Sequence, residues 1–189
     1  MLFRSAEKGA NHPFYQISKG GVILPDLVEM EYIQGTKKLF PKKYMRALKA
    51  MRDAYSAARP GKILTVTTGY RDIGQQRVLY EQYLARNKTG TEVAEPGKSL
   101  HNCGLAVDLS MVENGTSYSD LYTTFSKKNS VVKEDVFSRV SRGEFGPVAQ
   151  WMVQNCGRFG FYWDGWSYKE LWHYQLNVDL ARQAGLIDD

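Results

Sequence analysis

The chain has 189 residues, which is long enough for one domain with a substantial hydrophobic core. Its content of 43% hydrophobic and 24% charged residues is typical of a globular protein. No run of about 18 apolar residues occurs, which excludes a transmembrane helix. The net charge of +5 is concentrated near the N-terminus, because residues 1–62 hold twelve Lys or Arg and five Asp or Glu.

The basic N-terminal part has two interpretations. Its side chains attract nucleic acid, anionic lipid or the anionic bacterial wall, or they form a solvated helix face. No nucleic-acid-binding motif occurs, so we expect no dedicated nucleic-acid partner. The first residues lack the apolar stretch of roughly 7 to 15 residues found in secretory signals, so we expect synthesis in the cytoplasm without a signal peptide. Two cysteines, Cys103 and Cys156, are too few for a disulfide framework.

The first half of the chain predicts two helices with a strand between them. Pro41 can begin a helix, and apolar residues then recur at helical spacing until a Pro-Gly pair ends it. Residues 62–68 are rich in β-branched side chains and predict a strand. An amphipathic helix follows over residues 72–86, with Asp72 as its cap, and residues 87–100 read as a polar loop.

The second half predicts further strands around one more helix. Residues 105–111 predict a strand, and residues 147–158 predict a helix that ends at a glycine. Residues 161–163 and 171–176 predict a closing pair of strands. Few strands mixed with three or more helices predict an α+β fold, with a small antiparallel sheet backed by helices.

One polar stretch, residues 113–142, has only weak helical patterns. We interpret it as an insertion that borders the functional site. Because no repeat or Pro/Ser-rich linker occurs, we predict a single domain over residues 1–189 that includes this insertion.

Two of the three histidines lie in clusters of polar and glycine residues. In the first cluster His101 precedes a glycine that permits a sharp bend, and Asp108 lies between apolar neighbours in a predicted strand. Such a carboxylate is costly to bury unless it is paired or bound to a metal. In the second cluster His173 lies on an aromatic strand, three residues after Glu170.

Two neutral imidazoles and one carboxylate are a common ligand set for catalytic zinc, with a fourth position left for water. On a regular strand the side chains of Glu170 and His173 face opposite ways. Glu170 must therefore come from a turn or bulge entering the strand if it is to act as a general base there. Taken alone, each histidine is more often a structural residue than a ligand.

A third cluster, residues 67–71, follows the first predicted strand. A fixed guanidinium at Arg71 can stabilise the oxyanion of a tetrahedral intermediate or bind a substrate carboxylate. Taken alone, such an arginine is more often a surface salt-bridge partner.

Three motifs occur in order along the chain: Gly-Tyr-Arg, Ser-x-His-x-x-Gly-x-Ala-x-Asp and Glu-x-Trp-His. Together they resemble the LAS peptidases, a zinc family of D-alanyl-D-alanine carboxypeptidases, D-alanyl-D-alanine dipeptidases and phage L-alanyl-D-glutamate endopeptidases. The resemblance runs from Val28 to Gln175, which is most of the chain.

This resemblance implies one zinc ion per chain, bound by His101, Asp108 and His173. It also implies that Glu170 is the catalytic acid/base and that Arg71 stabilises the developing oxyanion. Three further residues match positions at the family's site and are predicted to bind substrate: Tyr70, Gln76 and Ser99. The alternative for the last two is a hydrogen bond within the local loop.

The subfamily depends on residues around the last motif. Cellular carboxypeptidases of the family commonly carry proline where this chain has Leu171. The ending over residues 173–176 looks more like that of phage endolysins. Those endolysins, however, commonly have Asp at the position of Glu170. We therefore expect an L-Ala-D-Glu endopeptidase of the phage endolysin type. The alternatives are a D-alanyl-D-alanine carboxypeptidase or dipeptidase and, in another functional class, a non-catalytic cell-wall-binding module.

The expected partner is the stem peptide of bacterial peptidoglycan, and the expected oligomeric state is a monomer. We expect the protein to reach the wall by phage-assisted release or as a virion component. Phe161 and Trp172 are interpreted as packing residues. Trp163 and Trp166 are left open between packing and a cleft wall that contacts glycan or stem peptide.

Overall fold

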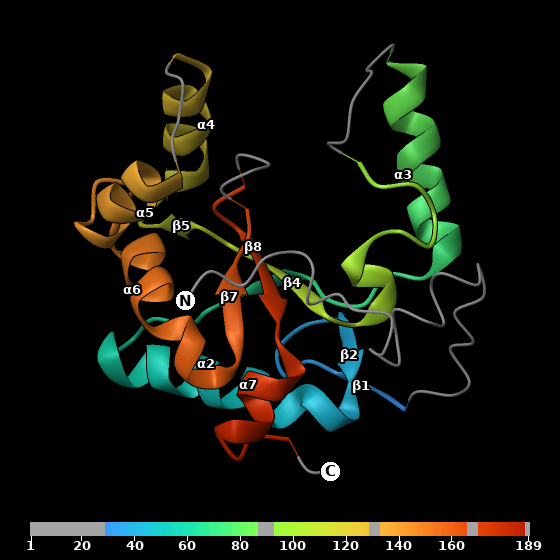
Figure 1. Cartoon of the computed structure of the whole chain (residues 1–189), viewed down its shortest axis with the longest axis horizontal. Helices are drawn as coiled ribbons and strands as arrows, with labels where there is room; N and C mark the ends of the chain where they lie inside the picture. The colour runs from blue at the N-terminus through green and yellow to red at the C-terminus, as the bar shows by residue number, and fades with distance from the viewer. Residues whose placement is uncertain (1–28, 87–92, 129–132, 166–169, 188–189) are drawn as a thin grey trace.

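The computed structural model describes residues 29–86, 93–128, 133–165 and 170–187. Its centre is a four-stranded antiparallel sheet in the order β3-β4-β8-β7 (Figure 1). The strands are β3 (Val66–Thr68), β4 (Ala106–Leu109), β8 (His173–Leu176) and β7 (Phe161–Trp163).

Helices surround this sheet. In Figure 1, α2 and α7 lie below the strands, whereas α3 and α4 stand on opposite sides of their upper end. The helices are α2 (Met45–Ala58), α3 (Ile73–Ala85), α4 (Tyr118–Lys128), α5 (Lys133–Ser141), α6 (Pro147–Asn155) and α7 (Val178–Gln183). Among the described residues, the 3-10 turns are η3 (Lys42–Tyr44), η4 (Leu100–Cys103) and η5 (Cys156–Phe159). Two small hairpins pair β1 (Met30–Tyr32) with β2 (Leu39–Pro41) and β5 (Val112–Glu113) with β6 (Thr116–Ser117).

A hydrophobic core between the sheet and the helices holds the strands in place. Helices α2 and α6 contribute Leu48, Met51 and Met152, while the sheet contributes Phe161 and Tyr174, and all five side chains are fully buried. Burial of each such side chain stabilises the fold by about 1.5–3 kcal/mol. The predicted packing role of Phe161 is therefore confirmed.

Helix α3 begins at the residue that the sequence predicts. The amide of Gln75 donates to the Asp72 carboxylate at 2.8 Å, and the amide of Asp72 donates to the Gln75 side chain at 3.2 Å. This reciprocal capping box satisfies two backbone donors that a helix start would otherwise leave unpaired.

The predicted α+β fold, a small antiparallel sheet backed by helices, is confirmed, but its strands are shorter than predicted. Residues 62–68 contribute only the three residues of β3, because their partner β4 is itself only four residues long and the register shifts between Val66 and Thr68. Strands β1 and β2 and helix α7 were not predicted. Elements of three to six residues are too short to leave a clear periodic pattern in the sequence.

Residues 113–142 contain parts of the β5–β6 hairpin and the helices α4 and α5. The hairpin is tied to the end of α2 by an ion pair in which Arg59 Nη2 lies 2.5 Å from Glu113 Oε1. That this segment is an insertion stays a prediction. None of the helices in the described part of the chain combines the length and hydrophobicity that a membrane span requires.

Several basic side chains around α2 have partners within the protein. Lys49 Nζ lies 2.5 Å from the Asp53 carboxylate, and Arg52 Nε donates to the Leu64 carbonyl at 2.9 Å. Because the Lys49 pair is exposed, it contributes little to stability. These contacts favour the solvated helix face over a binding surface.

Candidate metal centre and substrate pocket

The predicted metal ligands converge at one end of the sheet. Asp108 on β4 is paired directly with His173 on β8, and side chains of directly opposite residues project from the same face of a sheet. Asp108 Oδ1 lies 2.9 Å from His173 Nδ1 and 3.2 Å from His101 Nε2. One ligand atom from each of the three residues lies within 4.8 Å of the others. The three side chains are thus close enough to bind a single ion.

A short turn brings His101 to this position. The Ser99 hydroxyl accepts a hydrogen bond from the His101 amide at 3.3 Å and caps η4. Gly104 ends η4 with a left-handed φ of 65°, and a Cβ built on it would lie 2.3 Å from the Pro41 ring. Glycine is therefore required where the chain turns from η4 into β4.

The hydrogen bonds of His101 fit a metal ligand. Its Nδ1 lies 2.8 Å from the Gly69 carbonyl oxygen, which can only accept, so Nδ1 carries the proton. In the neutral ring, Nε2 then presents a lone pair toward the Asp108 carboxylate. Two electron-rich atoms 3.2 Å apart repel each other unless a proton or a metal cation lies between them, so this contact is a hydrogen bond when Nε2 is protonated and fits a shared metal ion when it is not. Around protein-bound zinc, a carbonyl usually accepts from the other ring nitrogen of a ligand histidine and so fixes the imidazole tautomer.

Asp108 is held as an anion. Burial disfavours its charged form, but hydrogen bonds with His101 and His173 outweigh burial and hold the pKa of the carboxyl well below its usual range. Its side chain is only 13% exposed. An anionic oxygen together with two imidazole nitrogens is a ligand set that suits zinc.

A cavity of about 320 Å³ opens at this cluster. Its wall includes the three ligands together with Arg71, Gln76 and Glu170, which the sequence predicts to act near them. The remaining lining residues are Leu79, Val93, Ala94, Lys98, Ser99, Leu100, Trp172 and Gln175. The pocket therefore offers both polar groups and apolar surface to a ligand.

Arg71 is fixed at the edge of this cavity. Its Nη1 donates to Gln76 Oε1 at 2.8 Å, and Gln76 Nε2 donates to the Ala94 carbonyl at 2.6 Å. The side-chain amide of Asn102 donates through Nδ2 to the Arg71 backbone carbonyl at 2.7 Å. Burial lowers the pKa of Arg71, while Asp108 and Glu170 oppose this shift, and an arginine remains a cation in this setting.

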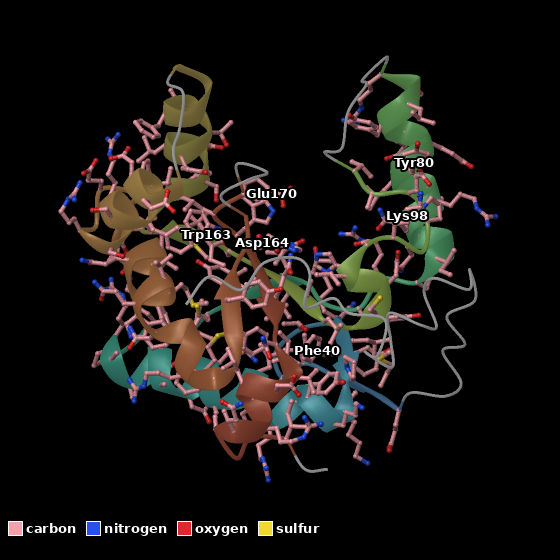
Figure 2. The ribbon with its side chains drawn as sticks, in the orientation of Figure 1. Phe40, Tyr80, Lys98, Trp163, Asp164 and Glu170 are labelled. Carbon is pink, nitrogen blue, oxygen red and sulfur yellow. The ribbon has the colours of Figure 1, made fainter. Side chains whose placement is uncertain are left out.

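Glu170 reaches the pocket from a turn and not from the strand. It precedes the two turn residues that enter β8, as the sequence argument requires. Figure 2 shows Glu170 at the upper end of the sheet, in the space between α3 and α4. The Trp163 indole nitrogen donates to the Glu170 carbonyl at 2.8 Å.

The other predicted residues divide into two groups. Ser99 and Gln76 line the pocket. Each also forms a local hydrogen bond, the alternative role considered for it: Ser99 accepts from the His101 amide, and Gln76 accepts from Arg71. Tyr70 is not among the lining residues, and its backbone amide donates to the Leu39 carbonyl at 2.6 Å. Trp172 both lines the pocket and packs on the core.

Sequence reasoning missed two polar residues of the site. Asn102 is fully buried and also accepts from the Gly97 amide at 3.1 Å, so it joins the Arg71 loop to the loop before η4. Gln175 lines the pocket, accepts from the Tyr162 hydroxyl at 2.6 Å and donates to Asp164 at 2.9 Å. Their position beside the histidine motifs was the available signal. Trp166 lies outside the described residues.

Comparison with known proteins identifies the family. The sequence profile described as "VanY: D-alanyl-D-alanine carboxypeptidase" matches residues 37–178. The chain belongs to the VanY family. The predicted relationship to the LAS peptidases is thereby confirmed. A relative from Bacillus subtilis (strain 168), the putative carboxypeptidase YodJ, is 32% identical over 105 residues. That match covers 53% of this chain, and the chain spans only 37% of the relative's length.

Solved structures support the VanY fold. The vancomycin resistance D,D-pentapeptidase VanY in complex with Zn(II) superimposes with a TM-score of 0.53 at 22% identity, covering 82% of this chain and 83% of that one. VanYB in complex with D-alanine-D-alanine gives a TM-score of 0.52 at 22% identity and covers 85% of each chain. At this level of identity the comparison establishes the shared fold.

Proposed function

We propose that the protein is a zinc-dependent carboxypeptidase that removes a terminal D-alanine from peptidoglycan stem peptides. The observation that carries this proposal is the arrangement of His101, Asp108 and His173 beside Arg71 and Glu170 in one cavity of a VanY-family chain. The matching family is described as D-alanyl-D-alanine carboxypeptidase and the relative YodJ as a putative carboxypeptidase, and both descriptions support this activity.

The residues around the metal site have separate tasks in this proposal. When bound, zinc supplies Lewis acidity for a carbonyl and for a water molecule. Glu170 removes a proton from the attacking water, whose oxygen bonds to the carbonyl carbon. Glu170 then delivers that proton to the amine as the C–N bond breaks. Arg71, held by Gln76, stabilises the negative charge that develops on the carbonyl oxygen or binds the substrate's terminal carboxylate.

The L-Ala-D-Glu endopeptidase expected from the last motif becomes the second candidate. Leu171 and the ending over residues 173–176 favour it, whereas the family profile and the named relatives favour the carboxypeptidase. A non-catalytic wall-binding module is disfavoured, because Glu170 and all three ligands are present in the pocket. Action at the cell wall after phage-assisted release or within a virion stays a prediction, as does the monomeric state.

The deciding experiment is digestion of a muramyl pentapeptide that ends in D-Ala-D-Ala, followed by mass spectrometry. Release of one D-alanine supports the carboxypeptidase, release of the D-Ala-D-Ala dipeptide supports a dipeptidase, and a new N-terminal D-glutamate supports the endopeptidase. The control is Glu170→Gln, which should keep its zinc and its fold while kcat falls about 100- to 10,000-fold. Wild-type turnover by this variant would refute the acid/base assignment.

A further inference from the structure

The main chain of Glu170 is held by the end of strand β7. The indole nitrogen of Trp163 donates to the Glu170 carbonyl at 2.8 Å, and the Glu170 amide donates to the Gly165 carbonyl at 2.7 Å. A Cβ built on Gly165 would lie 1.8 Å from the Glu170 carbonyl oxygen, so only glycine permits this approach. The backbone carbonyl and amide of Glu170 are therefore both held, the first by Trp163 at the end of β7 and the second by Gly165 two residues later.

The indole of Trp163 is in turn enclosed by α4 and α5. Trp163 is only 3% exposed, and Figure 2 shows it below Glu170. The ring centroid lies 5.8 Å from that of Tyr122 on α4 and 5.0 Å from that of Phe137 on α5. Tyr122 is itself fully buried. Such packing leaves the indole little freedom to rotate away from its acceptor.

This arrangement contrasts with that of the metal ligands. Strand register positions Asp108 and His173, whereas Glu170 lies three residues before the start of β8. No residue of segment 113–142 lines the pocket within the described chain, yet α4 and α5 reach Glu170 through Trp163. The segment can therefore influence the acid/base residue without touching substrate.

We infer that Trp163 is a positioning residue that holds Glu170 at the metal site through its main-chain carbonyl, with α4 and α5 as its support. The inference rests on the proposed role of Glu170 as acid/base. On this inference the predicted insertion, residues 113–142, contributes to catalysis, because its aromatic side chains Tyr122 and Phe137 support Trp163 and thereby position the Glu170 carboxylate. Of the two roles considered for Trp163, packing or a cleft wall that contacts substrate, this inference favours packing, with a specific hydrogen bond to Glu170.

The test compares two identical substitutions in the zinc-loaded protein. Trp163→Phe keeps an aromatic ring but removes the N–H donor. Trp151→Phe is the matched control, since Trp151 packs on Tyr55 and Phe159, away from the pocket. We expect Trp163→Phe to lower kcat about 10- to 100-fold, the cost of a small misplacement of a reacting group, with KM and zinc content unchanged. Trp151→Phe should keep the wild-type kcat.

Two further measurements separate positioning from general damage. In a Glu170→Gln background, Trp163→Phe should cause no further loss of kcat, because the group that it positions is already disabled. A crystal structure of Trp163→Phe should show the Glu170 carboxylate displaced while His101, Asp108 and His173 stay in place. An undisplaced Glu170, or an equal loss in both backgrounds, overturns the inference. Because the crystal structure needs no turnover, it remains decisive even if the wild type cleaves none of the stem peptides and the proposed function fails.

Discussion

Replacement of Gln76 by leucine tests whether the pocket arginine must be held in place. Gln76 is 1% exposed, and its side chain joins Arg71 Nη1 to the Ala94 carbonyl through bonds of 2.8 and 2.6 Å. Gln76→Leu removes both bonds at nearly constant volume. A hydrogen bond to a charged group contributes about 1.5–3 kcal/mol. If all of that free energy serves to orient Arg71 in the transition state, kcat/KM falls by about 10- to 150-fold, since each 1.36 kcal/mol is a factor of ten.

The assay is release of D-alanine from the muramyl pentapeptide, with thermal unfolding and zinc content measured on the same samples. Gln75→Leu is the control, because it makes the same change one residue earlier in α3 and disturbs only the capping box. We expect it to lower stability by about 1 kcal/mol and to leave kcat/KM unchanged. Equal kcat/KM for the two leucine variants, both folded, would refute the argument that Gln76 orients Arg71.

Three further predictions concern metal binding, stability and thiol reactivity. His101→Ala removes one of three ligands, so elemental analysis after dialysis should find less than one zinc per chain; full occupancy would contradict the assigned site. Arg59→Ala leaves the Glu113 carboxylate, whose side chain is 6% exposed, with the more distant Lys62 at 3.7 Å as its ion-pair partner among the described residues, and should lower the free energy of unfolding by about 2 kcal/mol in urea titrations. A loss near zero would show that the pair is not needed. Burial raises the pKa of Cys156 to about 12, so this buried thiol should not react with Ellman's reagent at pH 8 until the protein is unfolded, and rapid labelling of the native protein would contradict this.

The metal ligands and the fold class were predictable because they depend on residue type and spacing. A histidine motif and an aspartate in an apolar strand are unusual enough to be recognised, and the amphipathic pattern with Asp72 marks α3 at its first turn. The prediction that Glu170 enters from a turn followed from the alternation of side chains along a strand. These arguments need no knowledge of tertiary contacts.

Other features of the site were not predictable because they depend on contacts between distant segments. Gln76 was predicted to bind substrate, but its carbonyl oxygen also holds Arg71, a bond that depends on the turn into α3. Tyr70 shares a motif with Arg71, yet it is not among the residues that line the pocket. The bond from Trp163 to a main-chain carbonyl carries no signature in residue type, since every residue has such a carbonyl.

The pairing of Asp108 with His173 in adjacent strands means that a slip of one residue would turn one ligand to the opposite face of the sheet. Residues 110–172 form the connection between β4 and β8. The free-energy cost of closing such a connection grows only slowly with its length. Length can therefore change within this stretch, outside the core residues and those that hold Glu170, while Asp108 and His173 keep their places on the paired strands.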